Sequence, residues 1–213
     1  MAGKLSILLA LPLLLAACGS NTTVSHTVTV RASTTSVRLD TLRQVAQRIY
    51  TEESLGTVDQ GPLRSLERDD ALMQAAAGGN AAATQRDAAS AMAAAAHITG
   101  IRIVSGNRVL ANTHLPFVVA GKLRGIKTLP GRRIEISIQD ILGYVSLVHR
   151  VTGLDVVVHG SSGHALSSLP AATRAALPRS GRAQVASRSY NVVSFGEPGW
   201  AGERLTVWLL SPV

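Results

Sequence analysis

The chain has 213 residues, a length that suits one domain or one domain with a helical appendage. Its formal net charge is +8, nearly all from arginine, but the basic residues are scattered, without the dense runs or interleaved aromatic residues of a nucleic-acid groove. A single cysteine excludes a disulfide within the chain, and with 3% aromatic residues the core must consist mainly of Val, Ile, Leu and Ala.

Residues 1–17 predict an export signal. Lys4 supplies a positive charge, and the apolar run that follows is shorter than the roughly 20 residues needed to span a bilayer. Next, Leu15–Ser20 resembles the lipobox of bacterial lipoproteins, in which the cysteine is lipidated and the preceding peptide bond is cut. The resemblance implies a lipid on Cys18 and a place at the extracytoplasmic face of the cell membrane. The alternative is an ordinary secretory signal that happens to contain a cysteine.

Residues 18–35, rich in Ser, Thr, Asn and Val, predict a flexible, extended tether, with a short strand as the alternative. Residues 36–97 predict an N-terminal helical region. Its first helix begins near Ser36, because apolar residues recur at spacings of three and four from Leu39 to Ile49. An Ala-dominated segment over 81–96 has strong helix propensity but little bulk, so both packing against another element and disorder are open.

From residue 98 the pattern changes to short β runs. Two of them, joined by Ser105-Gly106-Asn107, predict a hairpin. Polar and apolar residues alternate over 133–138, as in a half-buried strand, and helical spacing from Ile141 predicts a helix ended by Gly153. Further strands are expected at 154–158, 164–166, 189–195 and 204–210, with a short Ala-rich helix within 170–184. The sheet should be largely antiparallel, since few parallel crossovers are available.

The element order over roughly 62–213, best from His97 onward, resembles an extracellular Cache domain, the PAS-like sensor module of bacterial receptors, and the predicted domain covers 98–213. The residues that carry the resemblance are the hairpin Ile101–Asn112, the helix Tyr144–Gly153, the hairpin Leu154–Leu166 and the turn Phe195–Trp200 before the last strand. The resemblance implies an α+β fold: a five- or six-stranded antiparallel sheet with helices on one face, preceded by the N-terminal helices. It also implies a small-molecule pocket between the sheet and the helix.

Two features depart from the family. Cache receptors usually continue through a membrane helix into a signalling domain, whereas this chain ends at Val213. The amino-acid-binding motif of two-module Cache sensors is not recognisable either. A partner that spans the membrane is therefore expected to carry any signal.

The candidate ligand-binding residues are Tyr144, His149, Arg150, Tyr190 and Trp200. His149 and Arg150 end a helix, where cations also simply complement the helix dipole, but arginine suits bidentate contact with a carboxylate or phosphate. Tyr144 lies on the apolar face of its helix, so a core position is the competing interpretation. Trp200, in a Pro-Gly turn, is either a lid over the sheet end or a loop anchor.

No catalytic or metal-binding set is recognised. His159 and His164 flank a turn without a further ligand, which makes a poor metal site. Residues 160–163 lack the G-x-S-x-G spacing of a nucleophile elbow and predict a β-turn. We therefore expect no enzyme activity and no cofactor, with an envelope hydrolase as a third hypothesis.

The sequence thus predicts a lipid-anchored extracytoplasmic sensory module that binds a small molecule and acts with a membrane partner, and not with nucleic acid. The alternative is a non-enzymatic interaction lipoprotein that docks another envelope protein. The positive charge indicates either an ordinary solvated surface or attraction to anionic envelope polymers or lipids.

Overall fold

The structure is a computed structural model that describes residues 34–55 and 60–213. The predicted signal peptide, Cys18 and nearly all of the predicted tether lie outside these residues. Within the described part of the chain, no helix combines the length and the apolar character needed to cross a membrane.

Four helices come first. They are α1 (Thr34–Leu55), α2 (Gln60–Glu67), α3 (Asp70–Ala77) and α4 (Ala81–Ala94). Asp69 and Asn80 cap α3 and α4, since each side chain accepts a hydrogen bond from a backbone N–H of the first turn. The Ala-rich α4 packs against α3 and the first β-hairpin, and Ala88 is fully buried there. This Ala-rich segment is therefore a packed helix and is not disordered.

A four-stranded antiparallel sheet follows these helices. Its strands are β1 (Gly100–Ser105), β2 (Arg108–His114), β3 (Arg124–Gly125) and β4 (Arg132–Ser137), in the order β2-β1-β4-β3. Ile101, Ile103 and Ile134 form a core with Leu72 and Met73 of α3. The helices α2–α4 thus supply the apolar cover of this sheet.

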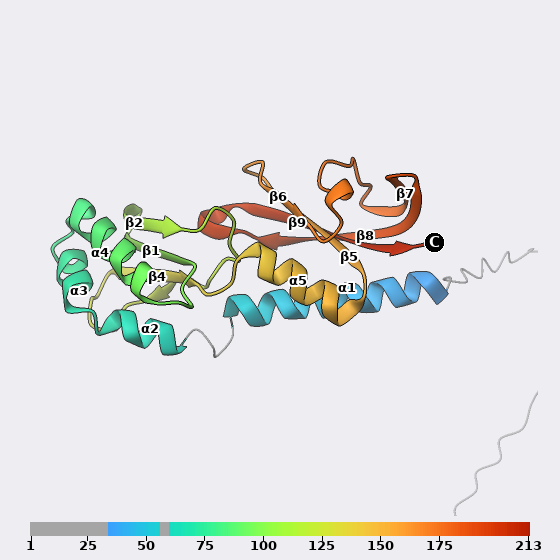
Figure 1. Ribbon diagram of the computed structural model, residues 1–213. Helices are drawn as coiled ribbons and strands as arrows, with labels where there is room; N and C mark the ends of the chain where they lie inside the picture. Colours follow the sequence, from blue (N-terminus) through green and yellow to red (C-terminus); the bar gives the residue numbers. More distant parts are fainter. Residues whose placement is uncertain (1–33, 56–59) are drawn as a thin grey trace, which may run out of the picture. The chain divides into compact units, whose positions relative to one another are not determined.

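A second antiparallel sheet has five strands. They are β5 (Asp155–Gly160), β6 (Ala165–Ser167), β7 (Ser180–Val185), β8 (Arg188–Pro198) and β9 (Arg204–Pro212), in the order β6-β5-β9-β8-β7. Helix α5 (Ile141–Thr152) begins after the cap Asp140 and ends at Gly153, whose φ of 69° suits glycine. Figure 1 shows α1 and α5 running along this sheet, and both helices contribute to the core on one of its faces.

The α+β class, the antiparallel pairing and the helices on one face of the C-terminal sheet are confirmed. The single sheet of five or six strands is wrong, because the β runs divide into two sheets with separate helical cover. The Ala-rich helix expected within 170–184 is also wrong: only Pro170–Ala172 forms a 3₁₀ turn, and the strand β7 begins at Ser180. Instead, Ala172, Ala175 and Leu177 pack against the core of the sheet in a segment that is largely irregular before β7.

Candidate functional site

The space between α5 and the five-stranded sheet is filled by side chains. Tyr144, Val145 and Val148 of α5 are 0–2% exposed, and they share one core with Val156 and Val207 of the sheet. The Cache resemblance implies a ligand pocket here, and the buried side chains correct that expectation. A ligand site must be sought elsewhere.

Tyr144 is a core residue. Its hydroxyl donates a hydrogen bond to the carbonyl oxygen of Ala46 at 3.2 Å, and its ring meets Tyr50 edge-on, with centroids 5.3 Å apart. Burial raises the pKa of both hydroxyls well above the ordinary tyrosine value. Tyr144 therefore fixes α1 against α5 and faces no groove.

The other four candidates are dispersed. Tyr190 is buried in the core on the opposite face of the sheet. Trp200 is 5% exposed and donates its indole N–H to the Asn112 side chain at 2.9 Å, which makes it an anchor. His149 and Arg150 are exposed at the end of α5, where the Nδ1 atom of His149 lies 2.7 Å from the Leu154 carbonyl oxygen. These residues do not meet in one cavity.

The two histidines beside the 160–163 turn also point to different partners. His159 Nε2 lies 2.9 Å from the Thr173 carbonyl oxygen, whereas His164 Nδ1 lies 2.9 Å from the Ser162 hydroxyl. Gly163 N–H donates to the Gly160 carbonyl at 3.0 Å, so the segment is a turn, as expected. Over residues 34–55 and 60–213, no cluster of His, Cys, Asp and Glu has metal-site geometry.

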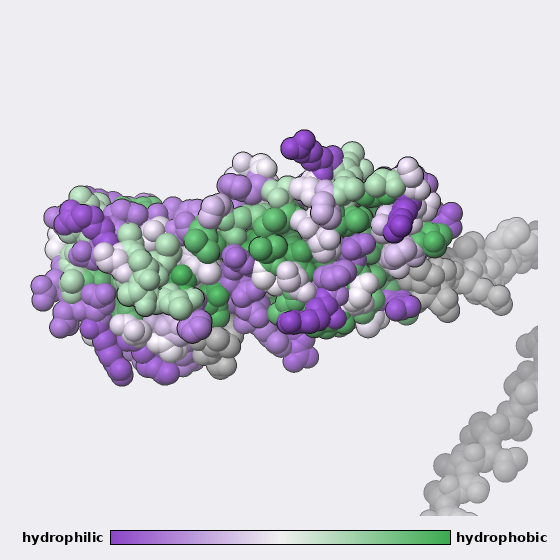
Figure 2. All heavy atoms as spheres, viewed as in Figure 1, coloured by the Kyte–Doolittle hydropathy of each residue, from purple (hydrophilic) through white to green (hydrophobic). Residues whose placement is uncertain are grey.

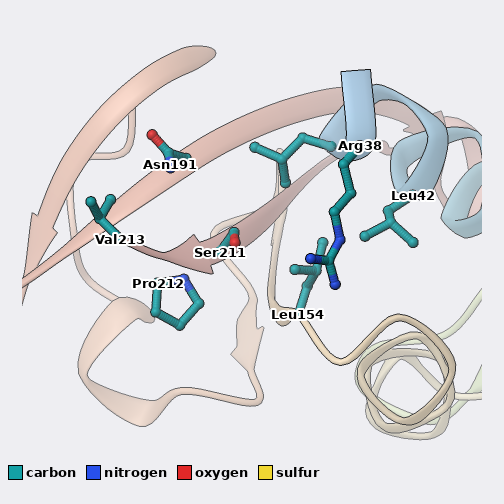
Figure 3. A pocket seen from close by; sticks show the side chains of 8 residues that line it. Arg38, Leu42, Leu154, Asn191, Ser211, Pro212 and Val213 are labelled. Carbon is teal, nitrogen blue, oxygen red and sulfur yellow. The ribbon is translucent and has the colours of Figure 1, made fainter. Parts of the chain in front are cut away.

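A groove of about 810 Å³ lies between the first turns of α1 and the edge of the five-stranded sheet. We call it the arginine groove, and it is lined by Leu39, Asp40, Arg43, Arg179, Ser180, Gly181, Arg182, Asn191, Val192, Val193 and Ser194. It shares Leu39 and Asn191 with a neighbouring hollow of about 480 Å³. Figure 3 shows that hollow, with Arg38 and Leu42 of α1 facing Pro212 and Val213 across it.

Strand alternation explains the polar lining of the groove. On β7, Ala183 and Val185 pack into the core on the far face of the sheet. Ser180 and Arg182, which alternate with them, therefore point to the α1 side. Helix α1 packs against β8 and β9 on that side. Its own side chain Leu39 is 7% exposed at this contact. The groove lies between α1 and the edge strand β7, which pairs with β8.

The electrostatics of the groove favour an anion. Arg43 contacts Asp40, with 3.3 Å between guanidinium nitrogen and carboxylate oxygen. The Nε atom of Arg43 is buried and has no hydrogen-bond partner among the described residues. Arg179 and Arg182 are exposed and form no ion pair within that part of the chain. Three guanidinium groups thus face one carboxylate, which is already paired.

Sequence reasoning missed this site. Arg43 lies in the first helix, whereas Arg179 and Arg182 lie far along the chain in and beside an edge strand. The surplus of arginine is the one signal that pointed in this direction, and by itself it does not say which arginines gather.

Glu197 supplies a pH-dependent contribution to stability. Its half-buried carboxylate lies near Gln47 of α1, and burial raises its pKa from 4.5 to about 7 against the opposing hydrogen bond from Gln47. The folded state thus holds this proton more tightly than the unfolded chain does. The resulting stabilisation is complete below about pH 4.5 and is lost as the pH rises through about 7.

We therefore expect Glu197→Gln to raise the melting temperature at pH 8 and to have little effect at pH 4.5. After allowance for the half-exposed position, the gain at pH 8 is about 1 kcal/mol, or roughly 2–4 °C. Melting curves from pH 4 to 9 measure it. Glu52→Gln, at an exposed position on the same helix as Gln47, is the control, and an equal gain in that variant would contradict the assignment to Glu197.

Comparison of the chain with models of known protein families, with curated proteins and with solved structures finds no match.

Proposed function

We propose that this protein is a lipid-anchored, extracytoplasmic module that binds a small anionic ligand in the arginine groove and acts with a membrane-spanning partner. The observation that carries the proposal is the buried Nε of Arg43, which lacks a partner among the described residues in a groove that also holds Arg179 and Arg182. Buried donors in proteins are almost always satisfied. A ligand carboxylate or phosphate oxygen would satisfy this one.

The arrangement of the five-stranded sheet supports a PAS-like sensor module. Strands β5–β9 form an antiparallel sheet in the order β6-β5-β9-β8-β7, with a strand number and a pairing that the resemblance implies. Helices α1 and α5 cover one face of this sheet, and the arginine groove lies on that same face. The candidate site is thus on the helix-covered face of the sheet, beside α1 and not beneath α5.

The lining residues favour a small organic anion. The groove volume of about 810 Å³ falls in the usual range for ligand sites, and Ser180, Asn191 and Ser194 add neutral hydrogen-bonding groups. Guanidinium groups bind carboxylate and phosphate in a bidentate manner. Arginine stays protonated at neutral pH and so cannot act as a general base there, which favours binding over turnover.

Thermal unfolding in the presence of chosen anions tests the proposal. We expect succinate, citrate, glutamate or inorganic phosphate to raise the melting temperature in a saturable way, and glucose to leave it unchanged. A ligand at 100 times its Kd adds about 2.7 kcal/mol to stability, or roughly 5–10 °C for a chain of this size. Sodium chloride at equal ionic strength separates specific binding from screening.

Arg43→Gln should abolish the shift, because it removes the unpartnered donor. The matched control is Arg86→Gln on α4, an exposed arginine outside the groove, which should keep the full shift. A shift that survives Arg43→Gln, or that sodium chloride reproduces, would overturn the assignment. The lipid on Cys18 is tested separately by the mass of the mature protein and its loss in Cys18→Ser.

Docking of another envelope protein is the second candidate function. Leu142 and Val151 on α5 are 55% and 56% exposed, and Figure 2 shows apolar side chains gathered over the five-stranded sheet and α5 in this view. A cooperative melt that no anion shifts would favour this function.

A further inference from the structure

The chain enters and leaves the described fold at one end of the five-stranded sheet. Arg38, in the first turns of α1, lines the same hollow as Pro212 and Val213 at the end of β9. Figure 3 shows these residues around one opening, and Figure 1 shows the start of α1 and the C-terminus at the same end. Val213 N–H donates to the Ser189 carbonyl at 3.0 Å, which places the β7–β8 turn there too.

Basic side chains concentrate at this end, which we call the terminal face. It carries the exposed residues Arg38, Arg150, Arg182 and Arg188. Arg150 belongs to it because α5 ends beside Leu154, which lines the same hollow, and Arg188 because it opens β8 at the β7–β8 turn.

The acidic side chains at the terminal face leave this charge largely uncompensated. Asp40 is paired with Arg43 at 3.3 Å, and Asp155 lies 3.8 Å from His149. The exposed guanidinium groups of Arg38, Arg150, Arg182 and Arg188 form no ion pair within the described residues. The terminal face is therefore a positive surface.

The position of the lipid relative to this face is limited by the sequence. Cys18 precedes Thr34, the first residue of α1, by 16 positions. A chain of that length spans at most about 58 Å even when fully extended. A lipid on Cys18, as proposed above, would keep the start of α1 within about that distance of the membrane surface, and the terminal face is the part of the fold at that start.

We propose that the terminal face binds the phosphate groups of anionic phospholipids and so orients the module on its own membrane. This inference rests on the lipid anchor of the proposed function but not on the small-anion site. Arginine pairs with phosphate through two parallel hydrogen bonds, and each basic residue near an anionic surface strengthens attachment about five-fold. The attraction is electrostatic and weakens with salt.

Vesicle binding by the chain without its lipid tests the proposal. Residues 19–213 contain the whole of Ser33–Val213, which forms one compact unit. The protein is sedimented with vesicles of phosphatidylcholine alone and with vesicles that also contain 30% phosphatidylglycerol. Each experiment gives the partition coefficient of the protein on that vesicle type. The variant Arg150→Glu/Arg188→Glu changes only terminal-face residues that lie outside the arginine groove. The matched control, Arg86→Glu/Arg108→Glu, makes the same change in net charge at exposed positions on α4 and β2.

We expect at least ten-fold stronger binding to the anionic vesicles, lost at high salt. The terminal-face variant should lose at least ten-fold, and the control less than three-fold. Equal binding to both vesicle types would overturn the proposal. Equal loss of binding in both variants would also overturn it, because net charge alone would then explain the attachment. If either variant melts below the wild type, comparison of the two vesicle types with wild-type protein decides the outcome.

Two further arms separate this surface from the small-anion site. Inorganic phosphate at millimolar concentration should not displace the protein from vesicles, whereas displacement would assign the binding to a free-anion site. Arg43→Gln should keep vesicle binding, and Arg150→Glu/Arg188→Glu should keep the thermal shift by small anions. If the wild-type protein shows only vesicle binding or only the thermal shift by small anions, the proposal for the missing behaviour has failed.

Discussion

Replacing Trp200 with alanine is expected to lower the free energy of unfolding by about 3–5 kcal/mol, or roughly 10 °C in melting temperature. The side chain is 5% exposed, and its indole N–H donates to the Asn112 side chain of β2 at 2.9 Å. Its ring approaches Gly100 so closely that a Cβ atom there would lie 3.0 Å from it. Trp200 follows β8, so it joins the five-stranded sheet to the first hairpin of the four-stranded one.

Circular dichroism during urea denaturation measures this loss. Trp200→Phe keeps most of the ring but removes the N–H donor, so it should lose less than the alanine variant. Unchanged stability in Trp200→Ala, together with weaker ligand binding, would contradict the anchor and restore the interpretation of Trp200 as a lid.

Replacing Gly121 with alanine is expected to lower the free energy of unfolding by at least about 3 kcal/mol. A Cβ atom at this position would overlap the carbonyl oxygen of Ile136 and lie 2.7 Å from its carbonyl carbon. These are backbone atoms of β4, which cannot move aside by changing rotamer. Either β4 or the segment before β3 must shift, and Ile134 and Ile136 in the core shift with it.

Gly125→Ala is the matched control, since nothing lies within 4 Å of a Cβ atom built there and its φ is not positive. It should change stability by less than about 1 kcal/mol. The two variants are compared by thermal and urea unfolding. Equal stability would show that the β4 backbone yields at little cost, and the close packing at Gly121 would lose its importance.

Elements that depend on neighbours in the chain were predicted well. The helix expected from Ile141 to Gly153 runs from Ile141 to Thr152, because Asp140 caps one end and Gly153 adopts a left-handed conformation at the other. The hairpin around Gly106 and the strand over 133–138 also lie within a residue or two of their expected bounds. In each case a local pattern of burial, cap and turn is sufficient.

Elements that depend on partners distant in the sequence were predicted poorly. The alanines between Pro170 and Pro178 favour a helix, but Ala172, Ala175 and Leu177 pack against the core of the sheet in a largely irregular segment, and this tertiary packing outweighs local propensity. The division of the strands into two sheets has the same origin, since alternation identifies a strand but not its neighbour.

The candidate site shows the limit most clearly. Tyr144 lies on the helix that was expected there, but the hydrogen bond from its hydroxyl to the Ala46 carbonyl makes it part of the core. Arg43 and Arg182 lie 139 positions apart in the sequence and line one groove because α1 packs against β8, the strand that pairs with β7.

By itself the sequence determined the helical and β regions, the ends of the capped helix and the surplus of arginine, whereas the export and lipidation signals stay predictions. These features follow from residue type and short-range spacing. Only the tertiary structure decided that two sheets form, that side chains fill the space beneath α5, and that arginines gather beside α1. Those outcomes depend on which apolar faces bury one another across long chain separations, and no local pattern specifies that choice.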